Sequence, residues 1–139
     1  MRLQLACYLC VSTFLFSPST VGQEQREQNV QVIQMTAKKY EYSPSPVHVK
    51  QGTRVRLKIT AIDRDHGITI ATVPEGADPA APAGLEFTSP QPKNGWKLLK
   101  GKEATIEFVA RRAGIYEFKC SVTCGLGHGR MKGQLVVDP

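Results

Sequence analysis

The chain has no long hydrophobic run, no block of like charges and little sulfur or imidazole. Its 139 residues include only four cysteines, three methionines and three histidines. The most apolar stretch, residues 3–16, is shorter than the ~20 residues of a helix that crosses a bilayer, which argues against a membrane anchor. The lysines and arginines behind the net charge of +6 are scattered, as on a solvated surface, so nucleic acid is not implied as a partner.

The N-terminus has the layout of a secretory signal peptide. Arg2 supplies a positive start, the apolar stretch follows, and small residues lead to Gly22. Cys7 lies before most of the apolar stretch, which argues against a lipoprotein acylation site. We expect a signal peptide over residues 1–22, a flexible polar tether over 23–29 and one domain over 30–139, in a periplasmic or secreted protein without a transmembrane segment after cleavage.

The remaining sequence lacks a helical period and an internal repeat, and it reads as short strands. The clearest alternation places Val55, Leu57 and Ile59 on one face and basic residues between them. A turn at Gln51-Gly52 precedes this strand. Other alternating or β-branched stretches lie within 30–44, 66–73, 96–120 and 132–139. This spacing predicts an all-β sandwich or Greek-key barrel.

One long segment interrupts the strand pattern. Residues 74–95 contain five prolines, which have no backbone N–H with which to pair. We expect a long connection without regular strand structure and with at most a short helical turn.

Outside the expected signal peptide, four of the seven cysteine, methionine and histidine residues gather in "CSVTCGLGHGRM", residues 120–131. This stretch supplies two thiols, an imidazole and a thioether, and the upstream "DRDHG" adds His66. Thioether and thiolate donors favour copper. Zinc remains open, because the two cysteines and two histidines form a Cys₂His₂ set, although zinc would leave Met131 without a role.

Two other roles for the cysteines fit less well. A disulfide between residues four apart closes a very short loop and needs a strained backbone. A catalytic thiol needs a base and an orienting third group, and the sequence offers no clear third member.

Several other residues have ordinary structural interpretations. His48 alternates outward with Lys50, and Trp96 is expected in the core or closing a loop. Asp63 is a candidate hydrogen-bond partner near His66. The three loop glycines, Gly125, Gly127 and Gly129, are expected to let the backbone wrap closely around a metal.

The order C-x₃-C-x₃-H-x₂-M resembles the dinuclear copper (CuA) loop of cytochrome c oxidase subunit II and of the cupredoxin domain of nitrous oxide reductase. "DRDHG" resembles the element that brings the first histidine in that family. The resemblance implies a cupredoxin-like Greek-key β-sandwich and two copper ions bridged by Cys120 and Cys124. It further implies one histidine for each copper, His66 and His128, and two weak outer ligands, Met131 and the carbonyl of Val122.

The resemblance implies a one-electron carrier, or the electron-entry module of a terminal oxidase or reductase, that is not an enzyme by itself. Its partner would be a redox protein such as a c-type cytochrome or another cupredoxin. Two alternatives stay open: a mononuclear blue-copper carrier, which would leave Cys124 spare, and a periplasmic copper-delivery protein for oxidase assembly.

Overall fold

The computed structural model describes residues 30–139, so the predicted signal peptide and tether lie outside the described residues. The regular structure of the described chain consists of short strands with one turn of 3₁₀ helix, η1 (His128–Arg130). The strands are β1 (Val30–Lys38), β2 (Glu41–Ser43), β3 (Val47–Lys50), β4 (Arg54–Ala61), β5 (His66–Ile70), β6 (Leu85–Phe87), β7 (Trp96–Leu98), β8 (Glu103–Ala110), β9 (Gly114–Lys119) and β10 (Lys132–Asp138).

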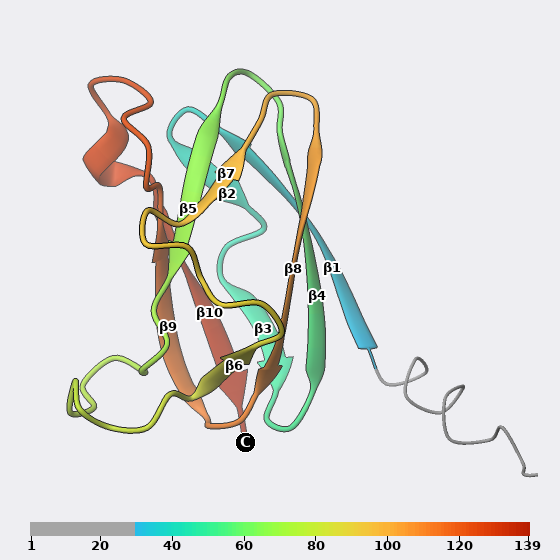
Figure 1. Cartoon of the computed structure of the whole chain (residues 1–139), viewed down its shortest axis with the longest axis vertical. Coiled ribbons are helices and arrows are strands. Elements are labelled where there is room, and N and C mark those ends of the chain that lie inside the picture. Colours follow the sequence, from blue (N-terminus) through green and yellow to red (C-terminus); the bar gives the residue numbers. More distant parts are fainter. Residues whose placement is uncertain (1–29) are drawn as a thin grey trace, which may run out of the picture.

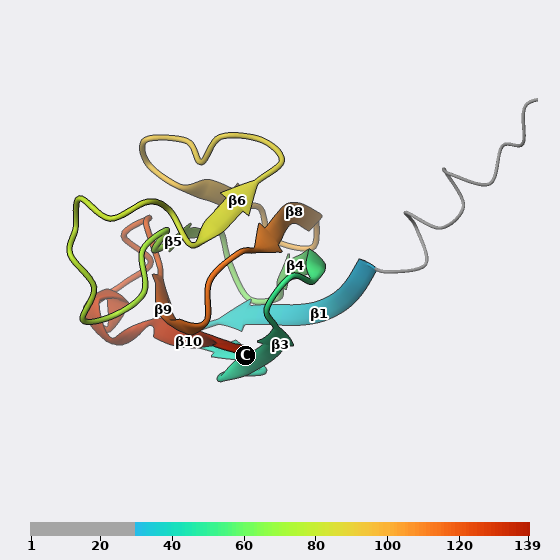
Figure 2. The same cartoon turned by 90° about the horizontal axis from the view of Figure 1, so that it is seen from below.

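The strands form two five-stranded sheets that face each other (Figures 1 and 2). The first has the order β2-β1-β4-β8-β6 and the second the order β3-β10-β9-β5-β7. Two pairings are parallel, β1 with β4 and β3 with β10, and the other strand pairs are antiparallel. Strands far apart in the sequence therefore become neighbours. The predicted all-β sandwich is confirmed.

Alternation along each strand places one face in the core between the sheets. In β4, Val55 and Ile59 are completely buried, whereas Arg54 is exposed. Tyr116 and Phe118 of β9, in the opposite sheet, belong to the same buried cluster and are among its largest side chains. The inward and outward assignment of β4 made from the sequence is thus confirmed, because a period of two matches the pleat.

Two expectations about the strands were wrong. Residues 30–44 are not one strand: the chain turns at Lys39-Tyr40, and β2 folds back antiparallel to β1. The proline-rich segment 74–95 does contain a strand, β6, which pairs with the end of β8. Prolines flank residues 83–89 but are absent from them, so the backbone N–H groups there remain free to pair.

The strand directions bring four connections to one end of the sandwich. These connections join β1 to β2, β4 to β5, β7 to β8 and β9 to β10, and they lie together at the upper end of Figure 1. His66 is the first residue of β5, and residues 120–131 follow β9. The two parts of the predicted metal site therefore reach the same end. Among residues 30–139, no helix is long or apolar enough to cross a bilayer.

Removing a core side chain of β4 should destabilise the whole sandwich. Ile59 has an exposed fraction of 0%, so Ile59→Ala should lower the free energy of unfolding by about 2–5 kcal/mol through lost burial and the cavity left behind. Val32 of β1 is 49% exposed, and Val32→Ala should change that free energy by less than about 0.5 kcal/mol. Urea unfolding of both variants checks this, and equal losses would contradict the inward assignment of Ile59.

Candidate metal centre

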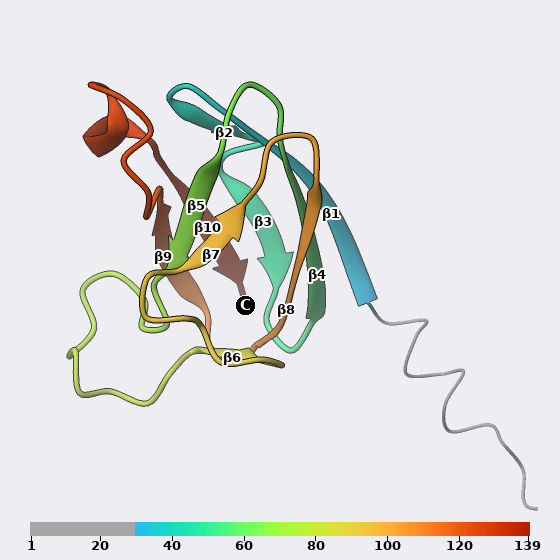
Figure 3. The same cartoon turned by 45° about the horizontal axis from the view of Figure 1, so that its top comes forward.

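The loop from Cys120 to Met131 is closed at its base by the backbone. The Cys120 N–H donates to the Met131 carbonyl at 2.9 Å, so the chain enters and leaves the loop at adjacent positions. Within the loop, the N–H groups of His128 and Met131 bond the carbonyls of Gly125 and His128 at 3.0 and 3.1 Å. Figure 3 shows the loop standing at the end of the sandwich beyond β9. The short closed loop gathers its donors at one place.

Three sulfur atoms meet on the inner side of this loop. The Sγ atoms of Cys120 and Cys124 lie 3.6 Å apart as free thiols, and Met131 Sδ lies 3.7 Å from Cys124 Sγ. All three side chains are buried. The Cys120 thiol also contacts the Val122 carbonyl at 3.1 Å. The structure thus places the soft donors predicted from the sequence in one cluster, with no disulfide between the cysteines.

His66 reaches the cluster from β5 with a fixed orientation. Its Nε2 lies 2.7 Å from Asp63 Oδ1, while its Nδ1 is buried without a hydrogen-bond partner. Burial alone would raise the pKa of Asp63, but hydrogen bonds from His66 and from the Lys39 and Arg64 backbones hold it at about 2. The ionised carboxylate accepts a hydrogen bond from Nε2–H, and in this tautomer Nδ1 carries the lone pair that a metal ion can bind.

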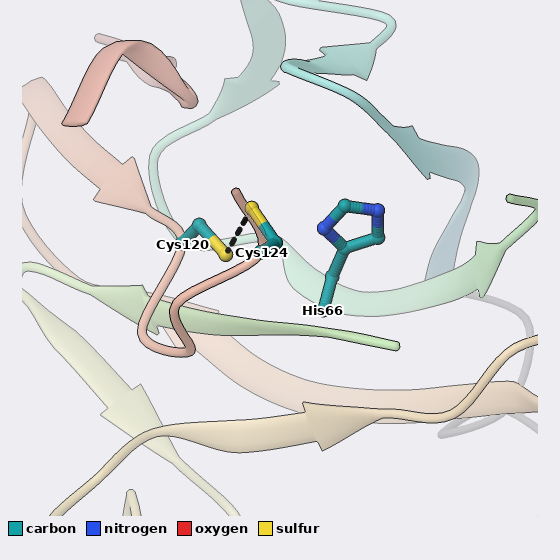
Figure 4. A group of neighbouring side chains, drawn as sticks. All are labelled: His66, Cys120 and Cys124. Carbon is teal, nitrogen blue, oxygen red and sulfur yellow. Dashed lines mark hydrogen bonds between the residues drawn. The ribbon is translucent and has the colours of Figure 1, made fainter. Parts of the chain in front are cut away.

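His66 and the two cysteines form a compact group of possible metal ligands. One ligand atom from each of the three lies within 4.8 Å of the others, and all three residues are buried (Figure 4). His128 lies outside this group, at 3.9 Å from its Nδ1 to Cys124 Sγ, and it is partly exposed. The site therefore has a buried side at His66 and a more accessible side at His128.

The surroundings of Cys124 keep its thiol protonated in the metal-free protein. Burial, with the neighbouring Cys120 thiol, raises the pKa of Cys124 to about 11. A metal ion binds the thiolate, so binding at neutral pH must release this proton.

The donor set fits a soft metal ion. The unpartnered Nδ1 of His66 faces a buried pair of thiols, and an orphaned buried nitrogen is costly unless something binds it. A thioether and a second imidazole complete the surroundings. This combination of sulfur and nitrogen suits copper better than a hard cation.

Two residues that sequence reasoning overlooked support this end of the sandwich, one by holding the loop and one by holding β5. Arg64, in the connection before β5, donates from Nη1 to the Cys124 carbonyl at 2.9 Å. Tyr42, buried in β2, donates its hydroxyl to the Gly67 carbonyl at 2.5 Å, and burial with nearby Cys120 raises its pKa well above the usual range. Neither role has a sequence signal, because both depend on which strands and connections meet at this end.

Tyr40 packs directly against the glycines of the loop. A Cβ at Gly127 would overlap the Tyr40 ring, and one at Gly125 would lie 2.8 Å from its hydroxyl. Gly125 also has a φ of +130°, which disfavours any other residue. At Gly129, by contrast, a Cβ would meet nothing within 4 Å. The close packing of Tyr40 therefore accounts for Gly125 and Gly127 but not for Gly129, and the expected wrapping around a metal stays a prediction.

The other sequence interpretations can also be compared with the structure. His48 is exposed on β3, with Nδ1 3.2 Å from Asp138 Oδ2, and does not join the site. Trp96 is half-buried and packs against Phe87 with ring centroids 5.1 Å apart, across the connection between β6 and β7. The hydrogen bond between Asp63 and His66 is present as predicted.

The fold and the donor cluster agree with comparisons to known proteins. A family model described as a cupredoxin-like domain matches residues 6–137, and the chain belongs to this family. It is also 30% identical over 131 residues to cytochrome c oxidase subunit 2 of Thermus thermophilus, across 86% of this chain and 83% of that protein. The predicted relationship to oxidase subunit II is confirmed.

Solved structures share the fold at lower identity. The periplasmic domain of cytochrome oxidase subunit II from Bradyrhizobium japonicum matches with a TM-score of 0.54 and 18% identity, over 76% of this chain and 82% of that one. A dithionite-reduced auracyanin from Roseiflexus castenholzii matches with a TM-score of 0.55 and 24% identity, over 78% and 97%. At this level of identity, both matches show that the β-sandwich fold is shared.

The contrast between two loop glycines gives a test of the close packing. Gly127→Ala should lower the free energy of unfolding by about 1–3 kcal/mol, because the new methyl group displaces the Tyr40 ring. Gly129→Ala should leave it unchanged or raise it by less than about 1 kcal/mol. Urea unfolding and copper titration of both variants measure the effects. Equal behaviour of the two variants would contradict the packing of Tyr40 on the loop.

Proposed function

We propose that this protein is a one-electron carrier that holds two copper ions in a CuA-type centre. The observation that carries the proposal is the pair of free cysteine sulfurs 3.6 Å apart, beside the unpartnered Nδ1 of buried His66. Two thiols this close can hold two ions jointly, whereas a single ion with four ligands leaves one sulfur of the cluster unused.

The ligands in this proposal come from residues that the fold already places together. Cys120, Cys124, His66 and His128 are the main ligands, and Met131 and the Val122 carbonyl are the weak ones. Copper held there would accept and release one electron at a time. The closed loop, the Asp63 carboxylate on His66 and the Arg64 guanidinium on the Cys124 carbonyl fix the positions of the ligands. Ligands held rigidly favour electron transfer, because little rearrangement accompanies the change of charge.

We further propose that the protein acts outside the cytoplasm, in the periplasm or after secretion. The signal-peptide layout of residues 1–22 and the relationship to oxidase subunit II support this location. In the same proposal the protein is not an enzyme by itself and exchanges electrons with a redox protein, such as a c-type cytochrome or another cupredoxin.

Copper stoichiometry separates the dinuclear centre from mononuclear alternatives. Protein reconstituted under reducing conditions should bind two coppers per chain, turn purple on partial oxidation and give an EPR signal split by two equivalent copper nuclei. Cys120→Ser and Cys124→Ser should each abolish this signal and leave at most one copper, because a single remaining thiol cannot hold both ions. His48→Asn, at an exposed histidine outside the site, is the matched control and should keep both coppers.

Other results would assign the site to another function. One copper per wild-type chain, with a four-line spectrum unchanged by Cys124→Ser, would indicate a blue-copper carrier. Ready loss of copper to a chelator such as bicinchoninate, without rapid reduction by a cytochrome, would indicate copper delivery.

The thioether should adjust the potential of the centre rather than hold the metal. Met131 is completely buried with Sδ beside Cys124, so Met131→Leu should keep both coppers and shift the reduction potential and optical bands. Met35→Leu makes the same change in the core of β1 and should leave both properties unaltered. Spectroelectrochemistry measures the shift, and loss of copper from Met131→Leu alone would show that the thioether is a main ligand.

A further inference from the structure

The end of the sandwich that carries the metal centre has an unusual charge. Four segments form this end: residues 38–41, 61–66, 98–103 and 119–132 (Figures 1 and 3). Together they contain eight Lys or Arg residues and four Asp or Glu residues. The segments at the opposite end, residues 50–54, 71–84, 110–114 and 138–139, contain four basic and three acidic residues. The positive charge of the described domain is thus concentrated near the metal centre.

The acidic residues at this end are paired within the protein. Glu41 binds Lys38 at 3.0 Å, and Glu103 binds Lys58 at 2.9 Å. Asp63 accepts from His66, and Asp65 accepts from the Lys100 backbone N–H at 2.8 Å. These four carboxylates therefore already have partners within the protein.

Most of the basic side chains at this end are exposed without a partner. Among the described residues, no ion pair or hydrogen bond engages the side-chain nitrogens of Lys39, Lys100, Lys102, Lys119 and Arg130, all of which are exposed. Lys119 and Arg130 belong to the segment that carries the metal loop, and the other three belong to the connections at residues 38–41 and 98–103 of the same end. A field of one sign over a docking surface attracts partners of opposite sign.

Apolar side chains lie among these cations. Leu126, between Cys124 and His128 in the loop, is fully exposed at 108%, and Ile62 and Leu99 are each 51% exposed. An exposed apolar centre with a charged rim is the usual anatomy of a protein interface. Since Leu126 lies between two ligands in the chain, a partner bound over it would also lie close to the metal.

We propose that this end is the docking surface for a redox partner whose own docking face is acidic around an apolar contact. The inference rests on the proposed function, since it takes the nearby centre as the source of the electron. It adds the sign of the partner's charge: the basic rim repels a partner with a basic face and accelerates encounter with an acidic one. An anionic membrane is the other possible occupant, and Leu126 beside the ligands favours a protein that exchanges electrons.

Small inorganic oxidants test the surface. The reduced, copper-loaded protein gives one electron to hexacyanoferrate(III), an anion, or to tris(phenanthroline)cobalt(III), a cation. As ionic strength rises, the rate of electron transfer to the anionic oxidant should fall and the rate of transfer to the cationic oxidant should increase. At low ionic strength, Lys39→Glu/Lys102→Glu should slow the anionic reaction at least about tenfold.

The matched control changes the same net charge at the opposite end. Lys50→Glu/Arg54→Glu replaces two exposed basic residues there and should slow the anionic reaction less than about twofold. Equal slowing by the two double variants would mean that only net charge matters, and it would overturn the proposal. A cationic oxidant that reacts faster in wild type at low ionic strength, after allowance for driving force, would overturn it as well.

A copper-independent measurement separates this inference from the proposed function. Redox-inert hexacyanochromate(III), added to the metal-free protein, should broaden amide NMR signals mainly in residues 38–41, 98–103 and 126–132. Equal broadening at both ends would overturn the docking surface even if the protein binds two coppers, and selective broadening would support it even if copper binding fails. Cosedimentation with phosphatidylglycerol vesicles that Lys39→Glu/Lys102→Glu abolishes would assign the surface to a membrane and overturn the protein partner.

Discussion

The hydrogen bond between the Cys120 N–H and the Met131 carbonyl is the constraint on which the candidate metal centre depends. It joins the end of β9 to the start of β10, so twelve residues must form a loop whose donors share one interior. The antiparallel pairing of β9 with β10 continues from this hydrogen bond along both strands. The rigidity of the site is therefore an extension of the rigidity of the sheet, and the loop needs little regular structure of its own.

Much of the fold could be predicted from the sequence because its strands alternate. Val55, Leu57 and Ile59 identify the inner face of β4 without any knowledge of its neighbours. The order of strands in each sheet could not be predicted in this way, because period two says which face is buried but not which strand lies alongside. The strand β6 was missed for a related reason: prolines on both sides hid a short segment that pairs only because β8 lies beside it.

The donor residues of the site could be predicted from spacing, but their support could not. The sequence brings Cys120 and Cys124 close by chain connectivity alone, and the resemblance adds His66. Arg64 and Tyr40 contact the loop from other connections, and Tyr42 of β2 bonds β5 next to His66. Each looks like an ordinary polar or aromatic residue in the sequence. Their roles appear only when the folded connections meet at one end.

The position of β10 between β3 and β9 has a consequence for how the cysteine thiols are protected. The last strand inserts between β3 and β9, and only then are both ends of the metal loop held. A chain still under synthesis, or one trimmed before β10, contains every cysteine yet lacks the enclosure around them. Its thiols would face solvent, oxygen and one another. The enclosure of the thiols therefore depends on the last strand as well as on the loop that carries them.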